Sequence, residues 1–125
     1  MTETQADPFA EAEAEMRRRA LAYPQVREDH PWGESAFKVR DKTFLFMGRS
    51  PRALHMTFKL PASFEFALDY PFAKPAGYNL ARGRWVATAF AAPGAVPLDV
   101  LAAWLDESFR AVAPKRLVAT LPACA

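Results

Sequence analysis

Near the N-terminus of this 125-residue chain, apolar side chains recur with the period of a helix. Phe9, Met16 and Tyr23 belong to a series spaced by three and four residues. Asp7 can cap this segment, and Pro8 suits the first helical position. Acidic residues crowd the first half and arginines the second, as the helix macrodipole favours. The pattern predicts one helix, which Pro24 ends.

Three strands are predicted to follow a connector. Residues 24–35 contain two prolines and a glycine and show no period, which is typical of a connecting segment. Residues 36–40 and 43–48 flank Asp41-Lys42, a weak hairpin signal. Residues 53–60 alternate strictly between apolar and polar, with His55, Thr57 and Lys59 on the polar face. Three antiparallel strands are the simplest interpretation.

The second half of the chain predicts a helix, a hairpin and a longer helix. Residues 61–70 have helical spacing and stop at Pro71. Residues 77–80 and 84–90 predict two strands joined through a turn, in which Gly83 can take a positive φ. Residues 97–113 carry one apolar stripe, and we expect Leu101, Leu105 and Phe109 to pack against the sheet, in particular against Phe37, Phe44, Phe46 or Leu54.

This order of elements predicts a two-layer α+β fold with the sequence α-β-β-β-α-β-β-α. Short strands close in sequence pair antiparallel, and helices packed on one face of the sheet bury all the stripes together. The length fits a single domain spanning residues 1–125. One sheet face is left without a helix.

Composition limits the cellular context and the cofactors. No apolar run reaches the roughly 18 residues that span a bilayer. The N-terminus is acidic, whereas a secretory signal peptide begins with basic residues followed by an apolar stretch. We therefore expect a cytoplasmic protein that contacts no membrane. Cys124 is the only cysteine and lies beside the C-terminal residue, which excludes an intrachain disulfide. His30 and His55 are isolated, so we expect neither a metal nor a cofactor.

The motifs of the common enzyme classes are missing from the sequence. It has no HExxH, GxSxG or phosphate-binding glycine loop. Asp106 and Glu107 are adjacent on a predicted helix, so they point about 100° apart and cannot share a substrate. We expect a protein that is not an enzyme.

Charge is unevenly distributed along the chain. Residues 1–36 carry eight acids against four arginines, and residues 37–84 carry nine bases against three acids. The first segment therefore has a net charge of −4 and the second of +6. A patch of positive charge attracts polyanions. A basic strand face that discourages edge pairing explains the same pattern.

Aromatic residues near these basic residues also allow two interpretations. Trp32, Tyr78 and Trp85 either pack in the core or stack on a ligand. Arg82 and Arg84 are too costly to bury unpaired, so we expect them to face solvent or a partner.

Three blocks of the sequence resemble the MmcQ/YjbR family. They span residues 23–47, 58–90 and 97–115, and their most specific parts are PWGE, YNLARGRWV and LDESFRAV. The resemblance implies a small bacterial α+β domain related in shape to frataxin-like and secretion-chaperone-like folds. It also implies a DNA-binding protein with a double-wing arrangement and no assigned catalytic residues. Asn79 stands where many members carry histidine, and Ala87 where asparagine is common, so a role that rests on those side chains is not implied here.

Charge and resemblance together lead to a non-catalytic DNA-binding module. We expect a monomer of low sequence specificity that contacts phosphates through its basic sheet and hairpin. The nucleic-acid-binding residues expected from the sequence are Lys38, Arg40, Lys59, Tyr78, Arg82, Arg84 and Trp85. The alternative is a protein-interaction module that receives a partner on the free sheet face or an edge strand. A frataxin-like metal role is disfavoured because the sheet is basic.

Overall fold

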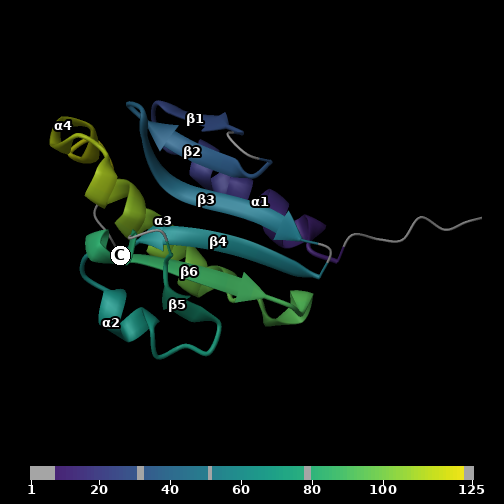
Figure 1. Ribbon diagram of the computed structural model, residues 1–125. Coiled ribbons are helices and arrows are strands. Elements are labelled where there is room, and N and C mark those ends of the chain that lie inside the picture. Colours follow the sequence, from purple (N-terminus) through teal and green to yellow (C-terminus); the bar gives the residue numbers. More distant parts are fainter. Residues whose placement is uncertain (1–7, 31–32, 51, 78–79, 123–125) are drawn as a thin grey trace, which may run out of the picture.

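The computed structural model describes residues 8–30, 33–50, 52–77 and 80–122. Its centre is one antiparallel sheet with the strand order β1-β2-β3-β4-β6-β5 (Figure 1). The strands are β1 (Val26–Asp29), β2 (Ser35–Val39), β3 (Lys42–Ser50), β4 (Ala53–Lys59), β5 (Ala73–Pro75) and β6 (Trp85–Phe90). The chain thus has the predicted α+β architecture.

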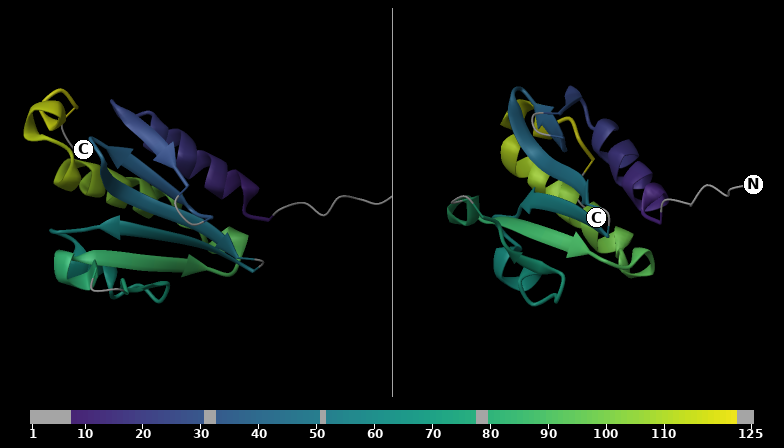
Figure 2. Two further views of the ribbon diagram at one scale, coloured as in Figure 1. Left: turned by 45° about the horizontal axis from the view of Figure 1, so that its top comes forward. Right: turned by 45° about the vertical axis from the view of Figure 1, so that its right-hand side comes forward.

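The two long helices lie on the same side of this sheet (Figure 2). The helices are α1 (Ala10–Leu21), α2 (Phe64–Ala67), α3 (Leu98–Val112) and α4 (Lys115–Val118), with short 3₁₀ turns η1 (Leu80–Gly83) and η2 (Pro93–Ala95). We call the side under α1 and α3 the covered face and the other side the open face. Figure 1 views the sheet from the open face, with both long helices behind it.

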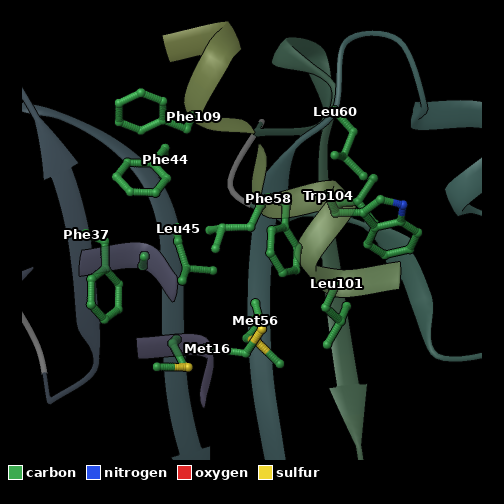
Figure 3. Close-up of a cluster of buried hydrophobic side chains, with 14 of the residues drawn as sticks. Met16, Phe37, Phe44, Leu45, Met56, Phe58, Leu60, Leu101, Trp104 and Phe109 are labelled. Atoms are coloured by element: carbon green, nitrogen blue, oxygen red, sulfur yellow. The ribbon is translucent and has the colours of Figure 1, made fainter. Parts of the chain in front are cut away.

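The core fills the space between the helices and the covered face. Phe58 and Met56 of β4 lie against Leu101 and Trp104 of α3, as Figure 3 shows. The Phe44 and Phe109 rings meet edge to face, with centroids 5.1 Å apart. Leu101, Leu105 and Phe109 are all buried, which agrees with the stripe read from the sequence.

Two strands differ from the sequence prediction. β1 lies inside the segment predicted to be a connector, because three of its four residues are charged and its pattern is too short to recognise. It pairs with β2, with Val26 opposite Val39. β5 is formed by residues 73–75, ahead of the predicted strand 77–80, in which residues 78 and 79 lie outside the described residues. β5 pairs with β6 in spite of Pro75. An edge strand tolerates proline because one of its sides needs no hydrogen bonds.

Smaller differences occur in the turns and helices. The positive φ of the β5–β6 loop belongs to Arg84, at 64°, and not to Gly83. The helix predicted over 61–70 is the single turn α2, and α4 was not predicted. Asp7, proposed as a cap, lies outside the described residues, as do Trp32, Tyr78, Asn79 and Cys124.

A bulge in β3 places Phe46 on the open face rather than in the core. Residues 37 and 38 of β2 pair with 45 and 43 of β3, so Phe44 has no partner in the ladder. Phe44 and Leu45 consequently both point to the covered face, and both are fully buried. In a regular strand, Phe44 and Phe46 would share a face.

Polar residues near the end of α3 hydrogen-bond the helix to the sheet and to the segment before α2. The Ser108 hydroxyl donates to the Phe44 carbonyl at 2.5 Å and accepts the Lys59 N–H at 2.9 Å. Glu107 accepts hydrogen bonds from the backbone N–H groups of Ala62 and Ser63 and from the Ser63 hydroxyl. Glu107 and Ser108 of the LDESFRAV motif therefore make structural contacts.

Candidate functional site

Side chains on the open face lie in rows that cross the strands, because residues paired across an antiparallel sheet point the same way. The first, which we call the cationic row, crosses from β1 to β6 and contains Arg27, Lys38, Thr43, Lys59 and Trp85. The second, which we call the middle row, crosses all six strands and contains Asp29, Ala36, Phe46, Thr57, Ala87 and Lys74.

Lys59 and Trp85 form the centre of the cationic row. The Lys59 ammonium lies 5.9 Å from the Trp85 ring centroid, within the range of a cation–π contact. The Trp85 ring is 5.7 Å from that of Phe46, and both aromatic residues are only half-buried. A Cβ at Gly83 would come within 3.3 Å of Lys59 and Trp85, so glycine leaves room for this pair. The structure thus places Trp85 on the open face rather than in the core.

The other sequence-predicted cations of β2 and its turn have partners. Lys38 lies 3.2 Å from Asp29 on the neighbouring strand. The hydrogen bond from Lys38, together with that from the His30 N–H, lowers the pKa of Asp29. Arg40 lies in the β2–β3 turn, with φ at 51°, and donates to the Gln25 side chain. Arg40 is therefore hydrogen-bonded to the residue that precedes β1.

Arg82 and Arg84 differ although they are two residues apart. Arg84 donates to the Pro61 carbonyl at 2.9 Å and to Glu65 at 2.5 Å, and its guanidinium lies over the Phe64 ring. Only 40% of its side chain is exposed. The sequence predicted that both arginines face solvent or a partner, whereas Arg84 is bound largely within its own domain. Arg82, in η1, is exposed and has no carboxylate partner among the described residues.

Four cations on or beside the open face have no carboxylate partner within the described ranges. They are Lys42, Lys59, Lys74 and Arg82. Lys42 is paired with the buried Val39 and is therefore beside the open face rather than on it. It lines a hollow of about 250 Å³ at the end of the sheet, between Thr43, Lys59 and Trp85 and the α3 residues Ala111 and Val112. Lys74 stands at the β5 end of the middle row. Unpaired cations around exposed aromatic rings can hold phosphate groups while the rings stack on bases.

Small side chains in the middle row leave two further hollows with a common floor. Thr57 and Ala87 line both. The larger measures about 630 Å³ and is lined by Glu34, Phe46, Thr57, Ala76, Gly77, Leu80 and Ala87. The smaller measures about 350 Å³ and extends toward His55 and Lys74.

Sequence reasoning missed several residues of this surface. It identified Lys59 and Trp85, but Lys42, Phe46 and Glu34 were not among the predicted site residues. Thr57, which lines both hollows, could have been predicted as part of this surface, because the strict alternation of residues 53–60 places it on the same face as Lys59. Phe46 could not be assigned to the open face because its orientation depends on the bulge.

In the described part of the chain, no three histidine, cysteine, aspartate or glutamate side chains converge in a way that could hold a metal ion. No helix in the described ranges is long and apolar enough to cross a membrane.

The fold and the surface define a class of α+β proteins in which helices cover one sheet face and leave a grooved face exposed. The YjbR family model matches residues 21–111. The chain belongs to the YjbR family.

Two solved structures share the fold. A Deinococcus radiodurans protein with a DUF419 domain is 23% identical, with a TM-score of 0.62, over 78% of this chain and 75% of that chain. A protein from Pseudomonas syringae is 16% identical, with a TM-score of 0.62, over 79% of this chain and 97% of that chain. None of the curated proteins matches this chain.

Proposed function

We propose that this protein is a non-catalytic DNA-binding module that holds a strand on its open face. The observation that carries the proposal is Lys59 lying over Trp85, which in turn touches Phe46 on the sheet face that neither long helix covers. A cation beside half-buried aromatic rings suits an unpaired strand, whose bases can stack while its phosphates are neutralised. The proposal therefore favours single-stranded over duplex DNA.

The four unpaired cations set the expected strength of the electrostatic contribution. If three or four of them each neutralise one phosphate, the log–log salt slope for a single strand is about −2 to −3. Lys38 and Arg27 contribute less because each already has an aspartate partner. Phosphate contacts carry no sequence information, so this part of the binding is the same for all sequences.

The test is a titration of labelled single-stranded and duplex DNA at two salt concentrations. Lys59→Ala should weaken single-strand binding and reduce the salt slope by about 0.7, the share of one phosphate contact. Trp85→Leu should weaken single-strand binding more than duplex binding, because only the single strand has bases available to stack. Far-UV circular dichroism confirms that each variant is folded.

Arg82→Ala and Arg18→Ala form a matched pair for the same titration. Both arginines are exposed, but Arg18 lies on α1, away from the open face, and pairs with Glu15. We expect Arg82→Ala to lower the affinity and Arg18→Ala to leave it nearly unchanged. Wild-type protein that binds neither form of DNA at low salt would refute the proposal and favour a protein partner on the same face.

A further inference from the structure

The larger hollow of the open face combines apolar walls with two polar groups. Phe46 and Leu80 supply much of the apolar lining, and the polar groups are the Glu34 carboxylate and the Thr57 hydroxyl. Its volume of about 630 Å³ lies within the usual range for small-molecule pockets. A few polar groups in such a pocket determine which ligand it accepts.

Glu34 reaches this hollow by crossing over a glycine. It precedes β2, and a Cβ on Gly48 of β3 would lie only 3.2 Å from the Glu34 Cβ and 3.8 Å from Oε1. A larger residue at position 48 would push the glutamate away from the sheet. Glu34 is half-buried, and among the described residues it has neither an ion-pair nor a hydrogen-bond partner. A partly desolvated carboxylate of this kind favours a ligand that brings hydrogen-bond donors.

The hollow is adjacent to the Lys59 centre. Phe46 lines the hollow and contacts Trp85, and Trp85 lies under the Lys59 ammonium. A nucleotide whose phosphate sits at Lys59 therefore has an aromatic ring and an apolar hollow within reach of its base. The negative Glu34 repels phosphates but accepts base donors, so the two ends of a nucleotide are distinguished by charge.

We propose that this hollow holds one unstacked base of the bound strand and that Glu34 makes it selective for guanine. The inference rests on the proposed function. Guanine presents two adjacent donors, N1–H and the N2 amino group, which match the two carboxylate oxygens. Thymine presents one donor between two carbonyl oxygens, and these oxygens are repelled by the carboxylate. Adenine and cytosine each present a single amino group on this edge.

The experiment compares three oligonucleotides in the same fluorescence titration at low salt. They are a ten-residue oligothymidine, the same strand with one central guanine, and the same strand with one central hypoxanthine, which lacks the N2 amino group. Wild-type protein should bind the guanine strand about tenfold more tightly than oligothymidine, with the hypoxanthine strand between them. Glu34→Gln should reduce the guanine preference to less than about twofold without weakening the binding of oligothymidine.

Asp41→Asn provides the matched control. Asp41 is an exposed carboxylate in the β2–β3 turn, paired with Arg27, and it does not line the hollow. Its φ of 67° is one that asparagine tolerates. This variant removes the same charge and should keep the guanine preference.

The outcomes separate this inference from the proposed function. Equal affinity of wild-type protein for all three strands would overturn the guanine site and leave DNA binding intact. A guanine preference that persists in Glu34→Gln would also overturn it. Failure to bind any of the strands would instead refute the proposed function, on which the inference rests.

Discussion

The two faces of the sheet are made by alternating residues of the same strands, yet they differ in how tightly side chains pack and in whether polar groups have partners. On the covered face, Phe58 is fully buried, and the Ser108 hydroxyl satisfies two backbone groups. On the open face, the neighbouring residues Thr57 and Lys59 line hollows, and Lys59 has no carboxylate partner among the described residues. Folding requires the first arrangement and does not require the second.

The same contrast appears between two arginines of the β5–β6 loop. Arg84 is bound to the α2 region through a carbonyl, a carboxylate and an aromatic ring. Arg82 is exposed on η1. Basic residues close in sequence can therefore differ in their contacts, one bound within the domain and one exposed, and charge alone does not distinguish them.

The largest expected effect on the free energy of unfolding comes from comparing one phenylalanine on each face of the sheet. Phe58→Ala should lower the free energy of unfolding by about 3–5 kcal/mol because it leaves a cavity in the core. Phe46→Ala should cost about 1 kcal/mol or less, since its ring is partly exposed and loses less buried area. Urea denaturation of both variants measures the difference, and equal costs would mean that the open face is part of the core.

Ser108→Ala should have the next largest effect. The substitution leaves the Lys59 N–H and the Phe44 carbonyl without their hydrogen-bond partner in a buried position. An unsatisfied buried polar group costs about 1–3 kcal/mol. Ser50→Ala is the control, because that hydroxyl makes no hydrogen bond among the described residues. Similar urea midpoints for the two variants would contradict the role assigned to Ser108.

A smaller effect should distinguish the two arginines. Arg84→Ala should lower the free energy of unfolding by about 1 kcal/mol, an amount limited by solvent screening of its pair with the exposed Glu65. Arg82→Ala should leave stability unchanged. Thermal melts of both variants provide the measurement, and a lower melting temperature for Arg82→Ala would show that this side chain has a structural role.

The smallest expected effect is a dependence of stability on pH through Glu28. Burial raises the pKa of Glu28, but hydrogen bonds from Ser35 and Arg17 and the charge of Arg17 outweigh burial, so the pKa is lowered from its usual 4.5. A carboxyl with a lowered folded pKa stabilises the fold above its unfolded pKa, and this contribution is lost as pH falls through the folded pKa.

Unfolding midpoints between pH 6 and pH 3 test this contribution, with Glu28→Gln as the comparison. The wild-type midpoint should fall more steeply with decreasing pH than that of Glu28→Gln. Parallel curves would show that Glu28 does not contribute to the acid sensitivity.

The sequence predicted the elements with long and regular patterns. The apolar stripe of α3 and the alternation of β4 identified both elements and their buried faces, because each pattern repeats several times. β1 and β5 are too short to repeat a pattern, and their pairing depends on neighbours distant in the sequence. The location of Lys59 and Trp85 was partly predictable, whereas the hollow at Glu34 depends on Gly48 and the bulge in β3, which have no local signal.

The Ser108 hydroxyl, although it belongs to α3, bridges two strands of the sheet through hydrogen bonds. It joins Phe44 to Lys59 just beyond the last direct pair of β3 and β4, Leu45 with Phe58. The Lys59 amide can therefore exchange its hydrogen with solvent only when its hydrogen bond to Ser108 opens. Its exchange rate reports how often this contact between α3 and the sheet opens. The same residue thus contacts α3 through its backbone and Trp85 on the opposite surface through its side chain.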